Sequence, residues 1–315
     1  MKYALVLDSV ACIPEQELRR RPIKILPLTV KFEDVQYVDT TEEKALIPIH
    51  RAGRISVKSN ALSVTPDADN IRRFILKSVA SKFDVAICQT IGQAYTPIYD
   101  GYKTVAQSIA SDAKHIRMPL GIHSPFRMSV VDTGSLAAGQ GLVALYTDDL
   151  MREGLDFTDY RPIVEDFKTL VKSFTIVRDS VYIRHRVKQK GNKTVSYPVA
   201  LIANALAISP IANNQNSGID IIDMRNRGFD NSVNRVLGYC CERVLEGLVA
   251  PLINISFAGD PKSLMHHNNF KRLQHVCDDS GVALYVGVMT LAASINLGPG
   301  AMSIGIAPIN QDIDP

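Results

Sequence analysis

Short apolar runs alternate with longer amphipathic stretches along the first half of the chain. The runs have the length of buried strands, and the stretches between them carry the capping residues and acidic first turns of helices. The predicted strands are Tyr3–Leu7, Ile23–Phe32, Val85–Cys88 and Val130–Asp132. The predicted helices are Pro14–Arg21, Thr65–Ser81 with Thr65 as its N-cap, Pro97–Ile109 and Gly134–Met151. This order predicts a mostly parallel sheet with helices on both faces.

A second series of elements begins near residues 156–161. Its predicted helices are Ile163–Ser173, Pro198–Ala207, Asn231–Gly247 and Pro261–Asp278. Its predicted strands are Phe174–Val177, Ile208–Ala212, Gly218–Met224, Leu252–Phe257, Val282–Leu291 and Ala301–Ala307. We therefore expect an α/β protein of two domains: residues 1–158 with a parallel sheet, and residues 159–315 with a mixed or antiparallel sheet.

A glycine-proline turn, Gly298-Pro299-Gly300, separates the last two apolar runs. The glycines permit positive φ or a close approach of the backbone to a ligand, and the proline fixes one φ. The turn is expected to join two strands. It forms either the wall of a site or an ordinary connection.

Composition describes a globular protein, with 46% hydrophobic and 21% charged residues among 315. The net charge of +3 is too small to indicate nucleic-acid binding. The five cysteines form no C-x-x-C pair, which favours reduced thiols and a cytoplasmic location. No apolar stretch approaches the length of a membrane span.

Polar residues follow three predicted strands of the first half. They are Asp8-Ser9, Gln89-Thr90 and Asp132-Thr133, at the carboxyl ends where parallel sheets collect ligands. Two further clusters, Lys58–Ser63 and Gln89–Pro97, offer hydroxyl, amide and backbone N–H donors to an anion. The simpler alternatives are an irregular loop for the first and a Thr96 that only caps its own helix for the second.

The remaining candidate chemistry is sparse. The seven histidines lack a recognised metal spacing, so no metal site is expected, and no nucleophile–base motif is present. The basic run Arg184–Lys193 forms either a solvated hairpin or a docking patch for an acidic partner. It contains no interleaved aromatic residue of the kind that stacks on bases.

Taken in order, several segments resemble motifs of the DegV family of bacterial fatty-acid-binding proteins. The family patterns are D-S-T-A-D-L-P, V-V-P-L-T-V, V-V-D-S-K-S with G-x-G-L, V-V-D-D-L-E-Y-L, V-R-G and A-H-T-G-P-G-A. The matching segments here are Asp8–Pro14, Ile25–Val30, Val130–Ser135 with Gly139–Leu142, Val177–Ile183, Arg227-Gly228 and Asn296–Ala301. Their shared order and spacing span most of the chain.

The resemblance implies a long-chain fatty acid bound in a tunnel between the two domains, with no cofactor and no catalysis. Its carboxylate would be held by Ser59, Thr96 and Asn296. Secondary candidates at the same head group are Lys58, Asn60, Thr90 and Gly298. Some members present the lipid to a fatty acid kinase, and the family stretch linked to that contact corresponds to the run containing Arg184 and Arg186.

The chain departs from the family pattern at three places. Ser59–Ser63 replaces the T-S-Q-P-S loop, the segment around Thr96 is altered, and Asn296 stands where the family has histidine. An asparagine donates to a carboxylate but carries no charge. The family's G-G-R-I motif is absent, which weakens the expectation of a kinase partner.

Two other functions stay open at this point. One is an enzyme acting on a small phosphorylated or carboxylated metabolite, with Asp8 and Asp132 converging in a narrow cleft. If both carboxylates only brace loops, that hypothesis fails. The other is a regulatory protein that docks an acidic partner through Arg184–Lys193.

Overall fold

The computed structural model describes the chain except residues 33–34, 191–208, 224–226 and 313. Its first sheet is parallel throughout, as predicted, with the strand order β2-β1-β6-β7. The strands are β1 (Tyr3–Asp8), β2 (Ile23–Leu26), β6 (Val85–Thr90) and β7 (Arg127–Asp132). Alternation along β1 places Ala4 and Val6 on one face and Leu5 and Leu7 on the other, so both faces are covered.

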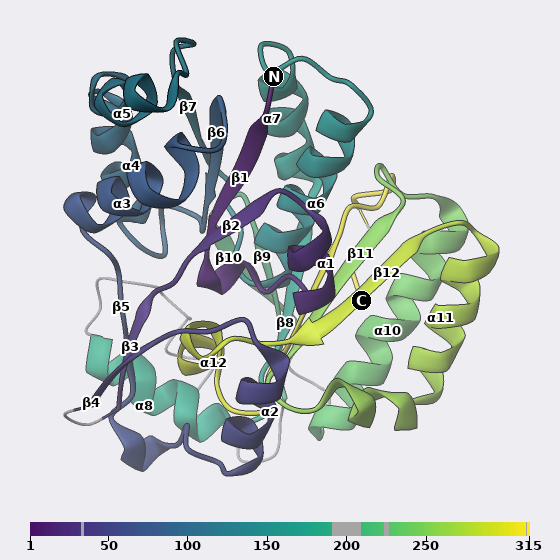
Figure 1. Ribbon diagram of the computed structural model, residues 1–315. Coiled ribbons are helices and arrows are strands. Elements are labelled where there is room, and N and C mark those ends of the chain that lie inside the picture. Colours follow the sequence, from purple (N-terminus) through teal and green to yellow (C-terminus); the bar gives the residue numbers. More distant parts are fainter. Residues whose placement is uncertain (33–34, 191–208, 224–226, 313) are drawn as a thin grey trace.

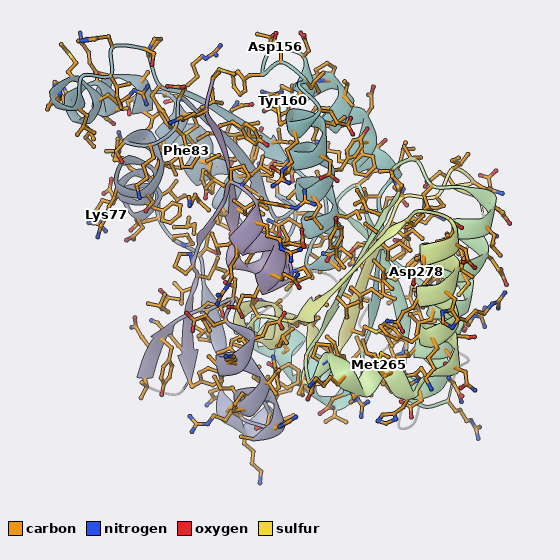
Figure 2. All side chains as sticks on the ribbon, turned by 45° about the vertical axis from the view of Figure 1, so that its right-hand side comes forward. Lys77, Phe83, Asp156, Tyr160, Met265 and Asp278 are labelled. Atoms are coloured by element: carbon orange, nitrogen blue, oxygen red, sulfur yellow. The ribbon has the colours of Figure 1, made fainter. Side chains whose placement is uncertain are left out.

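Two groups of helices cover this parallel sheet (Figure 1). One face packs against α3 (Ala68–Ile75), its π-helical extension η3 (Leu76–Ala80), α4 (Ile98–Ala106) and α5 (Ile109–Arg117), which leads into η4 (Met118–Leu120). The other packs against α6 (Ala138–Arg152) and α7 (Tyr160–Leu170). Tyr160 lies buried in this second core and its hydroxyl contacts that of Ser129 at 2.5 Å (Figure 2).

The second large sheet is mixed, with the order β10-β9-β8-β13-β11-β12. Only β11 and β12 pair in parallel, and the other neighbours are antiparallel. The strands are β8 (Lys172–Ile176), β9 (Ile211–Gln215), β10 (Gly218–Asp223), β11 (Leu252–Phe257), β12 (Ala283–Val288) and β13 (Met302–Ile306). Its outer face is covered by α10 (Phe229–Glu246), η5 (Pro261–His266) and α11 (Asn268–Asp279) (Figure 1).

Helix α6 lies between the two large sheets and contacts strands of both. Glycines permit this close approach. A Cβ at Gly141 would lie 2.4 Å from the carbonyl oxygen of Ala11, and one at Gly305 would lie 2.6 Å from that of Ala138. Asn254 of β11 donates to the carbonyl oxygens of Cys12 and Ala138 across the same junction. The contact is therefore tight and fixed in register.

A third, three-stranded antiparallel sheet was not expected. Its order is β4-β3-β5, with β3 (Thr29–Phe32), β4 (Val35–Val38) and β5 (Leu62–Val64). The predicted strand Ile23–Phe32 is in fact two strands in different sheets, because the chain leaves the parallel sheet at Pro27-Leu28. Helix α1 (Glu15–Arg20) precedes β2 in the chain, and α2 (Glu43–Arg51) and η2 (Val57–Ser59) lie between β4 and β5.

The segment before the glycine-proline turn also differs from the prediction. The turn was expected to join two strands, but it follows helix α12 (Leu291–Leu297), which has Thr290 as N-cap and Gly298 at a φ of 98° as C-cap. Thr65 does not cap its helix, because Asp67 accepts from the amide of Asn70 in that role. The predicted helix Pro198–Ala207 lies outside the described residues.

Candidate functional site

The candidate site is a cavity of about 300 Å³ where the parallel sheet, the three-stranded sheet and α12 meet. Most of its wall is apolar and includes Leu28, Ile98, Leu136, Ile183 and Leu297. The polar wall residues are Asp8, Ser63, Thr65, Thr96, Arg186 and Asn296. An apolar cavity with a few polar groups suits a ligand with a long apolar body and one polar end.

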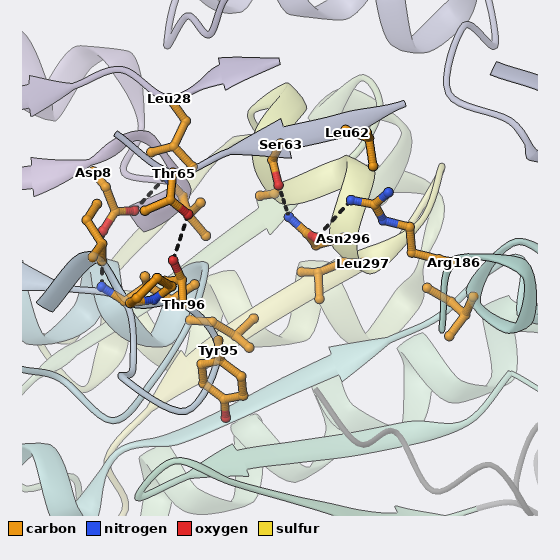
Figure 3. A pocket seen from close by; sticks show the side chains of 17 residues that line it. Asp8, Leu28, Leu62, Ser63, Thr65, Tyr95, Thr96, Arg186, Asn296 and Leu297 are labelled. Atoms are coloured by element: carbon orange, nitrogen blue, oxygen red, sulfur yellow. Dashed lines mark hydrogen bonds between the residues drawn. The ribbon is translucent and has the colours of Figure 1, made fainter. Parts of the chain in front are cut away.

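Asn296 reaches the cavity from α12, as the sequence predicts for a site residue (Figure 3). Its amide nitrogen donates to the Ser63 hydroxyl at 3.0 Å and to the Ala292 carbonyl at 2.7 Å. Its amide oxygen lies 3.5 Å from Nη2 of Arg186. The helix therefore holds Asn296 between β5 and Arg186.

The orientation of α12 depends on a buried carboxylate, Asp39. This side chain accepts from the backbone amides of Leu291 and Ala292 in the first turn of α12, and from the Ser9 hydroxyl at 2.7 Å. Burial raises the pKa of Asp39 to about 6, although these hydrogen bonds oppose the shift. An acidic side chain thus satisfies a helix N-terminus that carries a cavity residue.

Thr96 lies in the loop between β6 and α4 and lines the cavity. The prediction that it caps α4 is wrong: the helix begins at Ile98 with Pro97 at the N-cap and no side-chain cap. The Thr96 hydroxyl instead forms a 2.8 Å hydrogen bond with that of Thr65, which follows β5. This bond joins two cavity walls that are distant in sequence.

Ser59 does not line the cavity. Its hydroxyl donates to the Ser56 carbonyl and accepts from the Ser56 amide, so it closes the short helix η2. Lys58 and Asn60 are exposed and also lie outside the cavity wall. The hydroxyls that this segment presents to the cavity are those of Ser63 in β5 and Thr65 just after it, which lie on the same side of the chain. Polar residues at every second position of a strand point to the same face, and this pattern could have identified them in the sequence.

Two of the secondary candidates, Thr90 and Gly298, support the fold near the cavity but do not line it. Thr90 is buried at the end of β6, where its carbonyl accepts from the Thr133 hydroxyl, and it does not line the cavity. Gly298 ends α12, and a Cβ there would lie 3.4 Å from the side chains of both Tyr182 and Ile183. Gly298 therefore ends α12 against α8 and does not line the cavity.

Arg186 was predicted as a docking residue and is instead part of the cavity wall. Residues 180–190 form helix α8 (Ser180–Lys190), not a hairpin, and Arg186 on it is only 4% exposed. Its Nη1 donates to the Ala61 carbonyl at 2.6 Å. Burial lowers the pKa of its guanidinium. The side chain of Arg184 and residues 191–193 lie outside the described part of the structure.

The two strand-end aspartates brace loops. The Asp8 carboxylate accepts from the amides of Val10 and Ile91 and from the side chain of Gln140, and burial raises its pKa. Asp132 accepts from the amides of Gln93 and Gly134, and it does not line the cavity. The two carboxylates do not converge, so the enzyme hypothesis loses the pair on which it rested.

Within the residues described here, no group of three or more His, Cys, Asp or Glu side chains is arranged to hold a metal ion. No helix among them is both long enough and apolar enough to cross a bilayer.

The family comparison covers nearly the whole chain. Residues 2–308 match the family model described as "Uncharacterised protein, DegV family". A DegV domain-containing protein of Xanthomonas axonopodis pv. citri is 28% identical over 98% of both chains. Three solved structures have the same fold. A DegV lipid-binding protein of Thermotoga maritima has a TM-score of 0.73 and 17% identity, and the match covers 99% of this chain and 100% of that one. A fatty-acid-binding DegV protein of Thermus thermophilus has a TM-score of 0.72 and 17% identity, with 98% and 100% covered, and the fatty-acid-binding DegV of Bacillus subtilis has a TM-score of 0.70 and 19% identity, with 98% and 99% covered. With this fold and this match, the chain belongs to the DegV family.

Proposed function

We propose that this protein binds a long-chain fatty acid in the cavity beside α12, with the carboxylate at its polar wall. The observation that carries the proposal is the composition of that wall. Ser63, Thr96 and Asn296 place hydroxyl and amide groups in the wall of a mostly apolar space. Relatives of the same fold are described as fatty-acid-binding proteins.

The energetics favour such a ligand. Each methylene transferred from water to an apolar wall stabilises the complex by about 0.8 kcal/mol. The head group loses water on entry and needs hydrogen-bond donors in return, because an unpaired buried carboxylate is costly. The cavity's volume of about 300 Å³ lies at the lower end of the range for small-molecule sites.

Filling the cavity tests the proposal. Ala293 of α12 is fully buried and lines the cavity, so Ala293→Phe places a ring in the space assigned to the acyl chain. We expect extraction of freshly purified wild-type protein to yield fatty acid by mass spectrometry. The variant should lose most of it, and also most binding of labelled palmitate.

Ala45→Phe is the matched control, since Ala45 is exposed on α2 and lies outside the cavity wall. It should retain lipid like the wild type. Overpacking at Ala293 costs about 1–3 kcal/mol of stability, so both variants need a folding check by circular dichroism. A wild-type protein that contains no lipid and takes up no palmitate would refute the proposal.

We also propose that the bound acid is presented to a partner, of which a fatty acid kinase is one candidate. The support is the family resemblance of the sequence alone. Arg186 is buried in the described structure, so an acidic partner that binds the protein surface would not contact it directly. Co-purification of a kinase with the lipid-loaded protein, but not with Ala293→Phe, is the expected result.

A further inference from the structure

We infer that Arg186 is the buried counter-ion of the ligand's carboxylate, so that the cavity selects a full anion and orients it toward α8, α12 and β5. This inference rests on the proposed function and specifies which end of the cavity takes the head group. It assigns Arg186 to the ligand rather than to a protein partner.

The first observation is a buried cation without an acid beside it. Arg186 is 4% exposed, and within the described residues no aspartate or glutamate forms an ion pair with it. Most other arginines with a buried side chain here do have one, as Arg21 with Asp148 and Arg117 with Asp84 show. A buried charge is strongly unfavourable unless it is paired, so an anionic ligand would complete this site.

The second observation is the geometry of the donors. Nη1 of Arg186 donates to the Ala61 carbonyl, and among the described residues Nη2 makes only the long 3.5 Å contact with Asn296. Nε is buried and has no hydrogen-bond partner in the described structure. Nε and Nη2 form the edge of a guanidinium that binds a carboxylate through two parallel hydrogen bonds. Arg186 also lines the cavity, and we assign this edge to the proposed ligand.

The third observation is the other end of the cavity, where Asp8 lies (Figure 3). Its carboxylate already accepts three hydrogen bonds from the protein. A second carboxylate beside it would be repelled, whereas one beside Arg186 would be attracted. The nearby hydroxyls of Thr65 and Thr96 are bonded to each other. The charges at the two ends therefore favour the same orientation, with the head group near Arg186.

The test compares an acid with a neutral ligand of equal chain length. Binding of palmitate and of hexadecanol is measured for wild type, Arg186→Gln, Arg186→Lys and the control Arg19→Gln, whose side chain is exposed on α1 and lies outside the cavity wall. We expect wild type to prefer the acid by roughly tenfold to a hundredfold, as for a charge-assisted hydrogen bond. Arg186→Gln should lose this preference, Arg186→Lys should keep part of it, and Arg19→Gln should keep it fully.

A measurement on the wild type alone covers the case that Arg186→Gln does not fold. The ¹³C signal of carboxyl-labelled palmitate reports its ionisation while bound. Beside Arg186 the bound acid should stay ionised at lower pH than in a hydrophobic cavity without a cation. A bound acid that protonates above its usual pKa would overturn the inference, as would equal affinities for acid and alcohol. Failure of wild type to bind either ligand would instead refute the proposed function.

Discussion

At the scale of single residues, the pairing of Asn296 with Arg186 explains a departure from the family pattern. A protonated histidine at position 296 would place a second positive charge near a buried guanidinium. The amide oxygen of Asn296 faces Nη2 of Arg186 instead, while its nitrogen donates to Ser63. A neutral side chain that both accepts and donates suits a site whose charge is carried by its neighbour.

Asn296→Asp should convert this arrangement into an internal ion pair. The new carboxylate would occupy the donors that we assign to the ligand, so palmitate affinity should fall at least tenfold while the folded protein loses no stability. Asn296→Ala removes hydrogen bonds without supplying an anion and should weaken lipid retention less. Isothermal titration with palmitate and thermal melts of both variants distinguish these effects. If Asn296→Asp binds palmitate as well as wild type does, the head group lies elsewhere.

At the scale of elements, α12 depends on a contact that no local sequence pattern reveals. Its first turn is bonded to Asp39, which precedes it by about 250 residues. Because Asp39 is buried and accepts four hydrogen bonds, its ionisation affects how firmly the helix is held. This predicts a measurable pH dependence of stability.

The folded pKa of Asp39, about 6, lies above the value of about 3.9 for an unfolded aspartate. Between these values the folded state holds a proton that the unfolded state has lost, so the free energy of unfolding decreases as the pH rises. The contribution is about 3 kcal/mol, present below about pH 4 and lost above about pH 6. Asp39→Asn should remove it. Urea unfolding of both proteins across this range checks the slope, and parallel curves would contradict the assignment.

The sequence predicted the elements with strong local signals. The alternation of β1, β6 and β7 with helices follows from apolar runs that end at Asp8, Thr90 and Asp132. It did not reveal that Pro27 moves the chain into another sheet, since a proline also fits an edge or a bulge. Thr96 and Asn296 were identified by resemblance, and both line the cavity. Arg186 was misassigned because a basic run looks exposed, and its burial depends on tertiary packing.

At the scale of the whole molecule, α6 is the element on which both large sheets pack. Gly141→Ala should therefore be strongly destabilising, because the added methyl would meet the backbone of Ala11, which cannot rotate away. We expect a loss of at least about 2 kcal/mol by chemical denaturation. Gly238→Ala is the control within α10, where the nearest atom is 3.3 Å away at the end of the Asn269 side chain. A loss no larger than in this control would show that the sheets can separate slightly at α6.

The cavity wall joins segments from both halves of the chain. Asp8, Ser63 and Thr96 come from before residue 158, and Arg186 and Asn296 come from after it. If a fatty acid binds there as proposed, neither half made as a separate polypeptide should hold it alone. Mixed together, the halves would regain lipid only as they reassociate, so lipid uptake would serve as a fragment-complementation signal. A fatty acid bound as proposed would also link the halves, so its release should loosen the protein as a whole.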